Sequence, residues 1–168
     1  DALAAGDDLI CFAAEQAYGA FGFRERMKQD PFLYLFGSVG SFLGAGETLF
    51  EKLNELPFYT YINIGFESID ANTLTGIGKP VTVEQVKEAF KKMMEINAGF
   101  NRLEVTGNFI MGANLPSDHY LSLAELLKNA DVKNKSKGTI YLSPLKDSPN
   151  KRELLPQFYQ LKEESRLP

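Results

Sequence analysis

The 168-residue sequence contains one cysteine, one histidine and no tryptophan. A single cysteine, Cys11, cannot form a disulfide, a zinc knuckle or a multi-cysteine iron–sulfur site within this chain. A single histidine, His119, gives no basis for a Ser-His-Asp triad or a metal-ligand cluster. His119 follows Asp118 in the first turn of an expected helix, and we expect it on the surface.

The sequence also lacks a strong excess of either charge and lacks long apolar runs. Eighteen basic residues against twenty-two acidic ones give a net charge of −4, without a block of like charges. Nucleic-acid binding as a main role requires a dense basic face, so it is not indicated, whereas a small-molecule substrate of unknown identity stays possible. No apolar run approaches the ~18 residues of a membrane span, and no secretory leader is visible, so we expect no membrane contact and a cytoplasmic location.

The residues present are typical of a globular α/β protein, with 44% hydrophobic and 24% charged. The length predicts one domain, residues 1–168, with enough core to fold without a disulfide or metal. Helices are expected at 7–28, 47–56, 83–96, 117–129 and 153–165, and strands at 32–36, 58–65, 102–111 and 138–142. Thr82 and Gln85 form a capping-box pattern before the clearest helix. Ser117 is expected to cap the helix at 117–129.

Regular alternation of helices and strands predicts about four parallel strands joined by right-handed crossovers. The apolar run 32–36 is expected to be buried on both faces of the sheet. Residues 37–46 and 67–80 are expected to form a glycine-rich turn and an irregular connection. A doubly wound sheet and an arc of a β/α barrel both fit this order, and both place ligands at the carboxyl ends of the strands.

Several polar residues stand at those expected strand ends. Glu67 and Ser68 follow a buried strand, where a carboxylate could accept hydrogen bonds from a ligand amine or from ribose hydroxyls, or could anchor a loop or helix. Asn108, inside the third strand, could contact a ligand or bridge neighbouring strands. Lys79 does not belong to a phosphate-binding loop, because that motif requires glycine at position 73 and Ser or Thr at position 80. This sequence has Thr73 and Pro80 there. Lys79 could still pair with a carboxylate, or be solvated.

The stretches Tyr61–Asp70 and Leu74–Thr82 together resemble the radical S-adenosylmethionine superfamily, in the subgroup of oxygen-independent coproporphyrinogen oxidase and the Elongator catalytic subunit. In that subgroup an apolar strand ends in Ile-Gly-x-(Glu or Gln)-Ser, which matches Ile64 to Ser68, so Ser68 is grouped with the cosubstrate residues. Val105–Gly112 resembles the next strand of the family. The resemblance covers roughly residues 1–145.

The resemblance implies an incomplete (β/α)6 TIM-like barrel. It also implies reductive cleavage of S-adenosylmethionine by a [4Fe–4S] cluster to give a 5′-deoxyadenosyl radical. Glu67 takes the place of the residue that contacts the ribose and amino-acid part, and Lys79 that of the base pairing with the carboxylate. Asn108 takes the place of the polar residue near the ribose or adenine. Asp1 lies in the turn that binds the methionine amino group. Ser38 stands at a strand end where the family commonly has a ribose-binding acid.

The family binds its cluster through C-x-x-x-C-x-x-C, and this chain has only Cys11, expected as a small buried hydrophobe in a helix. We therefore expect the carboxyl-side part of a radical enzyme's barrel, with the first strands and the cluster loop absent. Such a piece would form part of the S-adenosylmethionine wall, would be inactive alone and unable to bind the cluster, and could self-associate through its open barrel edge. The alternative is a stand-alone β/α binding or interaction module without catalysis.

Overall fold

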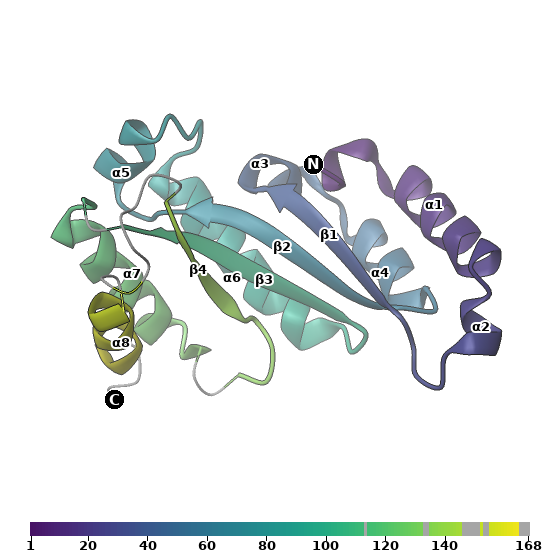
Figure 1. The fold of residues 1–168 in the computed structure, drawn as a ribbon. Coiled ribbons are helices and arrows are strands. Elements are labelled where there is room, and N and C mark those ends of the chain that lie inside the picture. The colour runs from purple at the N-terminus through teal and green to yellow at the C-terminus, as the bar shows by residue number, and fades with distance from the viewer. Residues whose placement is uncertain (113, 133–134, 146–151, 153–154, 165–168) are drawn as a thin grey trace.

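A four-stranded, all-parallel sheet forms the centre of the computed structural model (Figure 1), which describes residues 1–112, 114–132, 135–145, 152 and 155–164. The strands are β1 (Phe32–Ser38), β2 (Tyr59–Glu67), β3 (Leu103–Met111) and β4 (Ile140–Pro144). Their order is β1-β2-β3-β4, so each strand pairs with its neighbours along the chain. The four predicted strands and their parallel arrangement are confirmed, and the sheet does not close within the described residues.

Helices separate the strands. They are η1 (Leu3–Ala5), α1 (Asp7–Ala20), α2 (Phe23–Arg26), α3 (Val39–Gly44), α4 (Glu47–Glu55), α5 (Ala71–Gly76), α6 (Val83–Gly99), α7 (Ser117–Asn129) and α8 (Leu155–Glu164). The predicted capping box of α6 is confirmed: Thr82 Oγ1 accepts from Gln85 N at 3.2 Å, and Gln85 Oε1 accepts from Thr82 N at 2.9 Å.

Some helix boundaries differ from the prediction. The first expected helix is broken at Gly22, whose φ of 60° is left-handed, so α1 and α2 are separate. The expected turn at 37–46 contains α3, and the expected connection at 67–80 contains α5. Ser117 is the first residue of α7 and makes no side-chain cap, and Pro116 occupies the cap position. The expected ends of the last helix, 153 and 165, lie outside the described residues.

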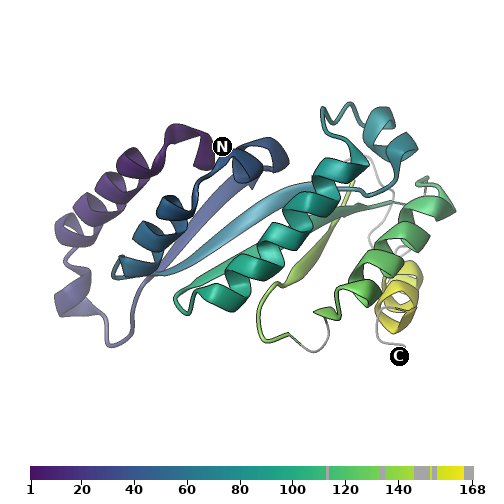
Figure 2. The same cartoon turned by 180° about the vertical axis from the view of Figure 1, so that it is seen from behind.

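The main crossover helices α4, α6 and α7 lie on one face of the sheet, as the view from behind shows (Figure 2). Right-handed crossovers that always step in the same direction place every connecting helix on the same side. A doubly wound sheet requires a reversal of strand order, and the described sheet has none. The helix-covered face carries the core, in which Ile62, Ile64 and Phe66 of β2 are fully buried.

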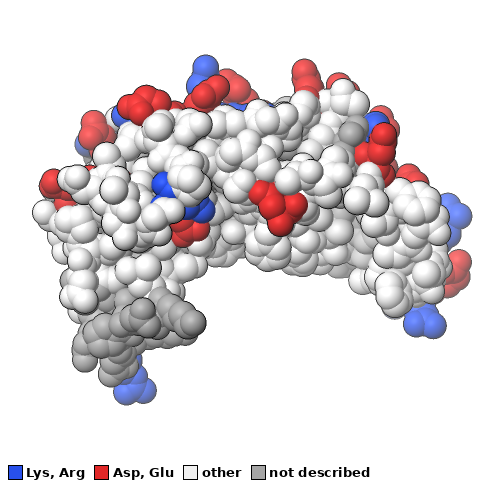
Figure 3. All heavy atoms as spheres, turned by 90° about the horizontal axis from the view of Figure 1, so that it is seen from above, with Lys and Arg blue, Asp and Glu red and all other residues white. Residues whose placement is uncertain are grey.

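The opposite face of the sheet, here called the open face, is uncovered within the described residues. Phe32, Tyr34 and Phe36 of β1 are 56%, 63% and 65% exposed, so the prediction that this run is buried on both faces is wrong. Tyr34 stacks on Tyr61 of β2 with ring centroids 5.3 Å apart. Viewed from above, the molecule is a crescent that is hollow on the side of the open face (Figure 3).

Candidate functional site

A cavity of about 520 Å³ lies at the carboxyl ends of the strands, on the open face. We call it the strand-end cavity, and its polar lining includes Asp1, Ser38, Asn63, Glu67, Lys79 and Asn108. Five of the six residues that the sequence singled out therefore line one hollow. Parallel strands explain this, because their carboxyl ends meet at the same edge of the sheet.

Glu67 is turned into the cavity by an irregularity in β2. The pairing with β3 shifts register between Gly65 and Glu67, and Glu67 has a φ of 65°, which is uncommon for a residue with a side chain. A Cβ atom on Gly65 would lie 2.7 Å from Glu67 Oε1 and 3.4 Å from Lys79 Nζ. The missing side chain at Gly65 is therefore what lets the carboxylate lie over the strand.

Lys79 supplies the positive charge of the cavity. Its Nζ lies 3.4 Å from Glu67 Oε1, and both side chains are 23% exposed. This distance is long for an ion pair, since charge-assisted N–H···O bonds are usually ~2.7–2.9 Å. The carboxylate and the ammonium therefore stand side by side, and each could still bind a ligand group of opposite charge.

Asn108 presents an amide donor to the cavity. Ser143 Oγ donates to Asn108 Oδ1 at 2.6 Å, which bridges β3 and β4 as one of the two interpretations of Asn108 predicted. Because this bond uses the amide oxygen, Nδ2 is the atom that could donate to a ligand. On the neighbouring strand, Asn63 Nδ2 donates to Thr106 Oγ1 at 2.9 Å, which leaves Asn63 Oδ1 as an acceptor.

Asp1 and Ser38 are bound to each other and to the start of α3. The Asp1 carboxylate accepts from Ser38 N at 3.0 Å and from Ser41 Oγ at 2.7 Å. Ser38 is the N-cap of α3, and its Oγ accepts from Ser41 N at 3.1 Å. These bonds already engage polar groups of both residues. Asp1 and Ser38 therefore line the border of the cavity, and they have fewer hydrogen-bonding groups left for a ligand than Glu67 or Lys79.

Ser68 lies apart from the other five residues. It is fully buried, and its Oγ lies 2.7 Å from His119 Nδ1. His119 is also fully buried, so the prediction of a surface histidine is wrong. Burial lowers the pKa of His119 from its usual 6.5. Its spacing from Leu123 and Leu127, four and eight residues on along the buried face of α7, is the sequence feature that could have predicted this.

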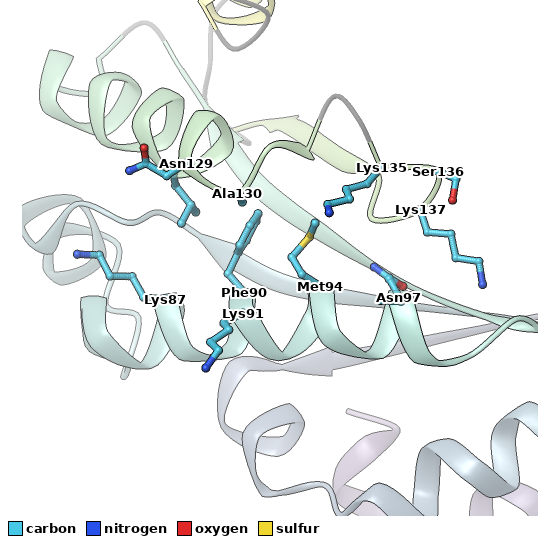
Figure 4. A pocket seen from close by; sticks show the side chains of 12 residues that line it. Lys87, Phe90, Lys91, Met94, Asn97, Asn129, Ala130, Lys135, Ser136 and Lys137 are labelled. Carbon is cyan, nitrogen blue, oxygen red and sulfur yellow. The ribbon is translucent and has the colours of Figure 1, made fainter. Parts of the chain in front are cut away.

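A second hollow of about 600 Å³ lies between α6 and the segment that follows α7 (Figure 4). We call it the lysine groove, after Lys87, Lys91, Lys135 and Lys137 in its lining. Lys137 Nζ is held by the carbonyls of Phe100, Asn101 and Leu103, at 2.6, 3.0 and 3.0 Å. The groove shares no lining residue with the strand-end cavity, and no sequence pattern pointed to it.

Cys11, expected as a small buried hydrophobe, is half-buried on α1 and packs against the core. In the described part of the chain, no group of three or more His, Cys, Asp or Glu side chains is arranged to hold a metal ion. Among the described helices, none is both long and apolar enough to cross a membrane. No protein-family model matches the chain, and no curated protein matches it.

Proposed function

We propose that this chain forms part of the S-adenosylmethionine-binding wall of a radical S-adenosylmethionine enzyme. The observation that supports the proposal is the convergence of Glu67, Lys79 and Asn108 on the strand-end cavity. The order of these residues along the chain is the order of the family's strand-end motifs. The described sheet is wound in one direction, with α4, α6 and α7 on the same face, which is also compatible with an arc of a (β/α)6 barrel.

The side chains in the cavity match the chemistry of S-adenosylmethionine. The methionine part carries a carboxylate and an ammonium, which would pair with Lys79 Nζ and a Glu67 carboxylate oxygen. Asn108 Nδ2 would donate to a ribose oxygen or an adenine nitrogen. A hydrogen bond to a charged group contributes about 1.5–3 kcal/mol, so two such contacts can hold the amino-acid part in one orientation.

The iron–sulfur cluster does not fit this chain. Multi-cysteine ligation requires several thiolates, and the sequence has only Cys11, which lies on α1. The cluster ligands would have to come from another part of the enzyme, and the cluster would supply the radical chemistry there. The role proposed for these residues is therefore to bind and orient S-adenosylmethionine. The substrate of such an enzyme would be a small molecule.

Calorimetric titration with S-adenosylmethionine tests the binding role. Lys79→Met is expected to weaken binding about tenfold, which corresponds to about 1.4 kcal/mol. Lys87→Met, in the lysine groove, is the matched control and is expected to leave the Kd unchanged. Equal effects of the two variants, or no binding of S-adenosylmethionine at millimolar concentration, would contradict the proposal.

The radical chemistry has a separate test in the coding sequence upstream of Asp1. We expect it to encode C-x-x-x-C-x-x-C, the motif that the resemblance requires. A binding-competent chain without that motif in its reading frame would overturn the radical-enzyme proposal and favour the stand-alone binding module. The two experiments therefore separate cosubstrate binding from catalysis.

A further inference from the structure

The turn after β2 holds the Glu67 carboxylate in place, and buried residues fix this turn from behind. Glu67 has the left-handed φ of 65°, a conformation that persists only when its surroundings stabilise it. Ser68 N donates to Phe66 O at 2.9 Å, and Asp70 N donates to Ser68 Oγ at 3.0 Å. Ser68 thus closes the turn on both sides.

The Ser68 hydroxyl is in turn bound to His119 of α7, with Oγ 2.7 Å from Nδ1. His119 Nε2 lies 3.0 Å from the Ile110 carbonyl of β3, which can only accept. Nε2 therefore carries the proton in the neutral ring, and Nδ1 accepts from Ser68 Oγ. One hydrogen-bond path therefore joins β3, α7 and the turn that carries Glu67.

We propose that Ser68 and His119 are positioning residues, which hold the Glu67 carboxylate at the place where it meets a ligand in the strand-end cavity. The identity of that ligand as S-adenosylmethionine rests on the proposed function, whereas the hydrogen-bond path itself does not. Neither residue touches the cavity, so both act through the turn. The path also makes the place of Glu67 depend on the protonation of one imidazole.

Protonation of His119 would add a proton to Nδ1 and abolish its acceptance from Ser68. The Ser68 hydroxyl would then accept from Nδ1 as well as from Asp70 N, which engages both of its lone pairs, and its own buried proton would lose the acceptor it has in His119. A buried donor without an acceptor is costly, so the hydrogen bonds that fix the turn weaken. Among the described residues, the charged and titratable groups that act on the ring are Asp70, through its charge, and Tyr120, through ring contact. The Asp70 carboxylate accepts from Thr73 N and Oγ1 at 2.8 Å. The Tyr120 ring contacts His119 with centroids 4.9 Å apart, and its OH donates to Gly112 O at 2.7 Å.

NMR can follow this path directly, because His119 is the only histidine in the sequence. As the pH is lowered from about 8 through the folded-state pKa of His119, which burial places below the usual 6.5, the amide signals of Glu67 and Asp70 are expected to titrate with the imidazole. His119→Asn, whose amide oxygen can accept from Ser68 but cannot be protonated, should keep the Glu67 signal and remove its pH dependence. Tyr120→Phe is the control and should preserve the joint titration.

A second experiment measures the Kd for S-adenosylmethionine in variants of Ser68 and His119. Ser68→Ala should weaken binding about tenfold at neutral pH, and His119→Asn should restrict the loss to about threefold. By linkage, saturating S-adenosylmethionine should lower the pKa of His119, since the neutral ring supports the bound position of Glu67.

Titration of His119 without a response at Glu67 would overturn the positioning role, even if Ser68→Ala fails to fold. If neither the wild type nor any variant binds S-adenosylmethionine, the proposed function is wrong. The pH titration followed by NMR then still tests the positioning role.

Discussion

Replacing Gly65 with alanine places a methyl group where the Glu67 carboxylate now lies. The new Cβ would be 2.7 Å from Glu67 Oε1, and ordinary contact begins at 3.4 Å, so the oxygen has to move by about 0.7 Å. Lys79 Nζ, at 3.4 Å from the same Cβ, is already at the limit of contact. The change is therefore directed at the two charged groups that carry the proposed binding.

The expected result is weaker binding without loss of the fold. Contact geometry has to be kept within about 0.5 Å for full effect, so a displacement of this size should raise the Kd for S-adenosylmethionine about tenfold, or 1.4 kcal/mol. The carboxylate is the far end of a flexible side chain, and alanine suits a strand better than glycine by about 0.5–1 kcal/mol. Gly65→Ala should consequently unfold in urea at the same or a slightly higher concentration than the wild type.

Gly107→Ala is the matched control, with the opposite expectation. Its Cβ would lie 2.9 Å from Phe66 Cε2 and 3.1 Å from Ile140 Cδ1, on the helix-covered face. These side chains are packed and cannot move away easily, so overpacking should cost about 1–3 kcal/mol of unfolding free energy. The Kd of Gly107→Ala should stay within about threefold of the wild type. An unchanged Kd in Gly65→Ala would refute the role assigned to Gly65, as would the same loss in both variants.

Three further predictions concern stability and association. Thr82→Ala removes the acceptor for Gln85 N and should lower the unfolding free energy by about 1 kcal/mol in urea titrations, with no change in ligand binding. Because burial lowers the pKa of His119, its contribution to stability is complete above pH 6.5 and is lost as the pH falls through the folded-state pKa. The urea midpoint should drop in that range, and less so in His119→Asn. The open face should support concentration-dependent self-association that Tyr34→Lys weakens in sedimentation velocity, and a monomeric wild type at all concentrations would contradict this.

The strands and the long helices were predictable because their patterns are local. β2 and β3 are apolar runs between turn residues, and the Thr82 capping box needs no tertiary contact. The short helices α3 and α5 do not show in the sequence because six residues are too few for a helical period, and both stand in segments rich in glycine or polar residues. The exposure of Tyr34 was missed for another reason: an apolar run does not tell whether anything covers its second face.

The candidate site was predictable to the extent that it depends on strand ends. Glu67, Lys79 and Asn108 were expected at one edge of a parallel sheet, and they lie there. The direction of Ser68 could not be predicted, because a shift of register inside β2 and the left-handed Glu67 decide which way each side chain turns. The polarity of His119 favours the surface, and only its helical spacing from Leu123 and Leu127 indicates the buried position that it has.

The most direct test of the binding claim is an NMR titration of the isotope-labelled chain with S-adenosylmethionine. The largest shift changes are expected at Gly65, Glu67, Lys79 and Asn108, with Lys87 of the lysine groove unchanged. Binding with a Kd as weak as about 1 mM, or −4.1 kcal/mol, would still be detected in this way. Shift changes confined to the lysine groove, or none at the strand-end cavity under saturating ligand, would contradict the account.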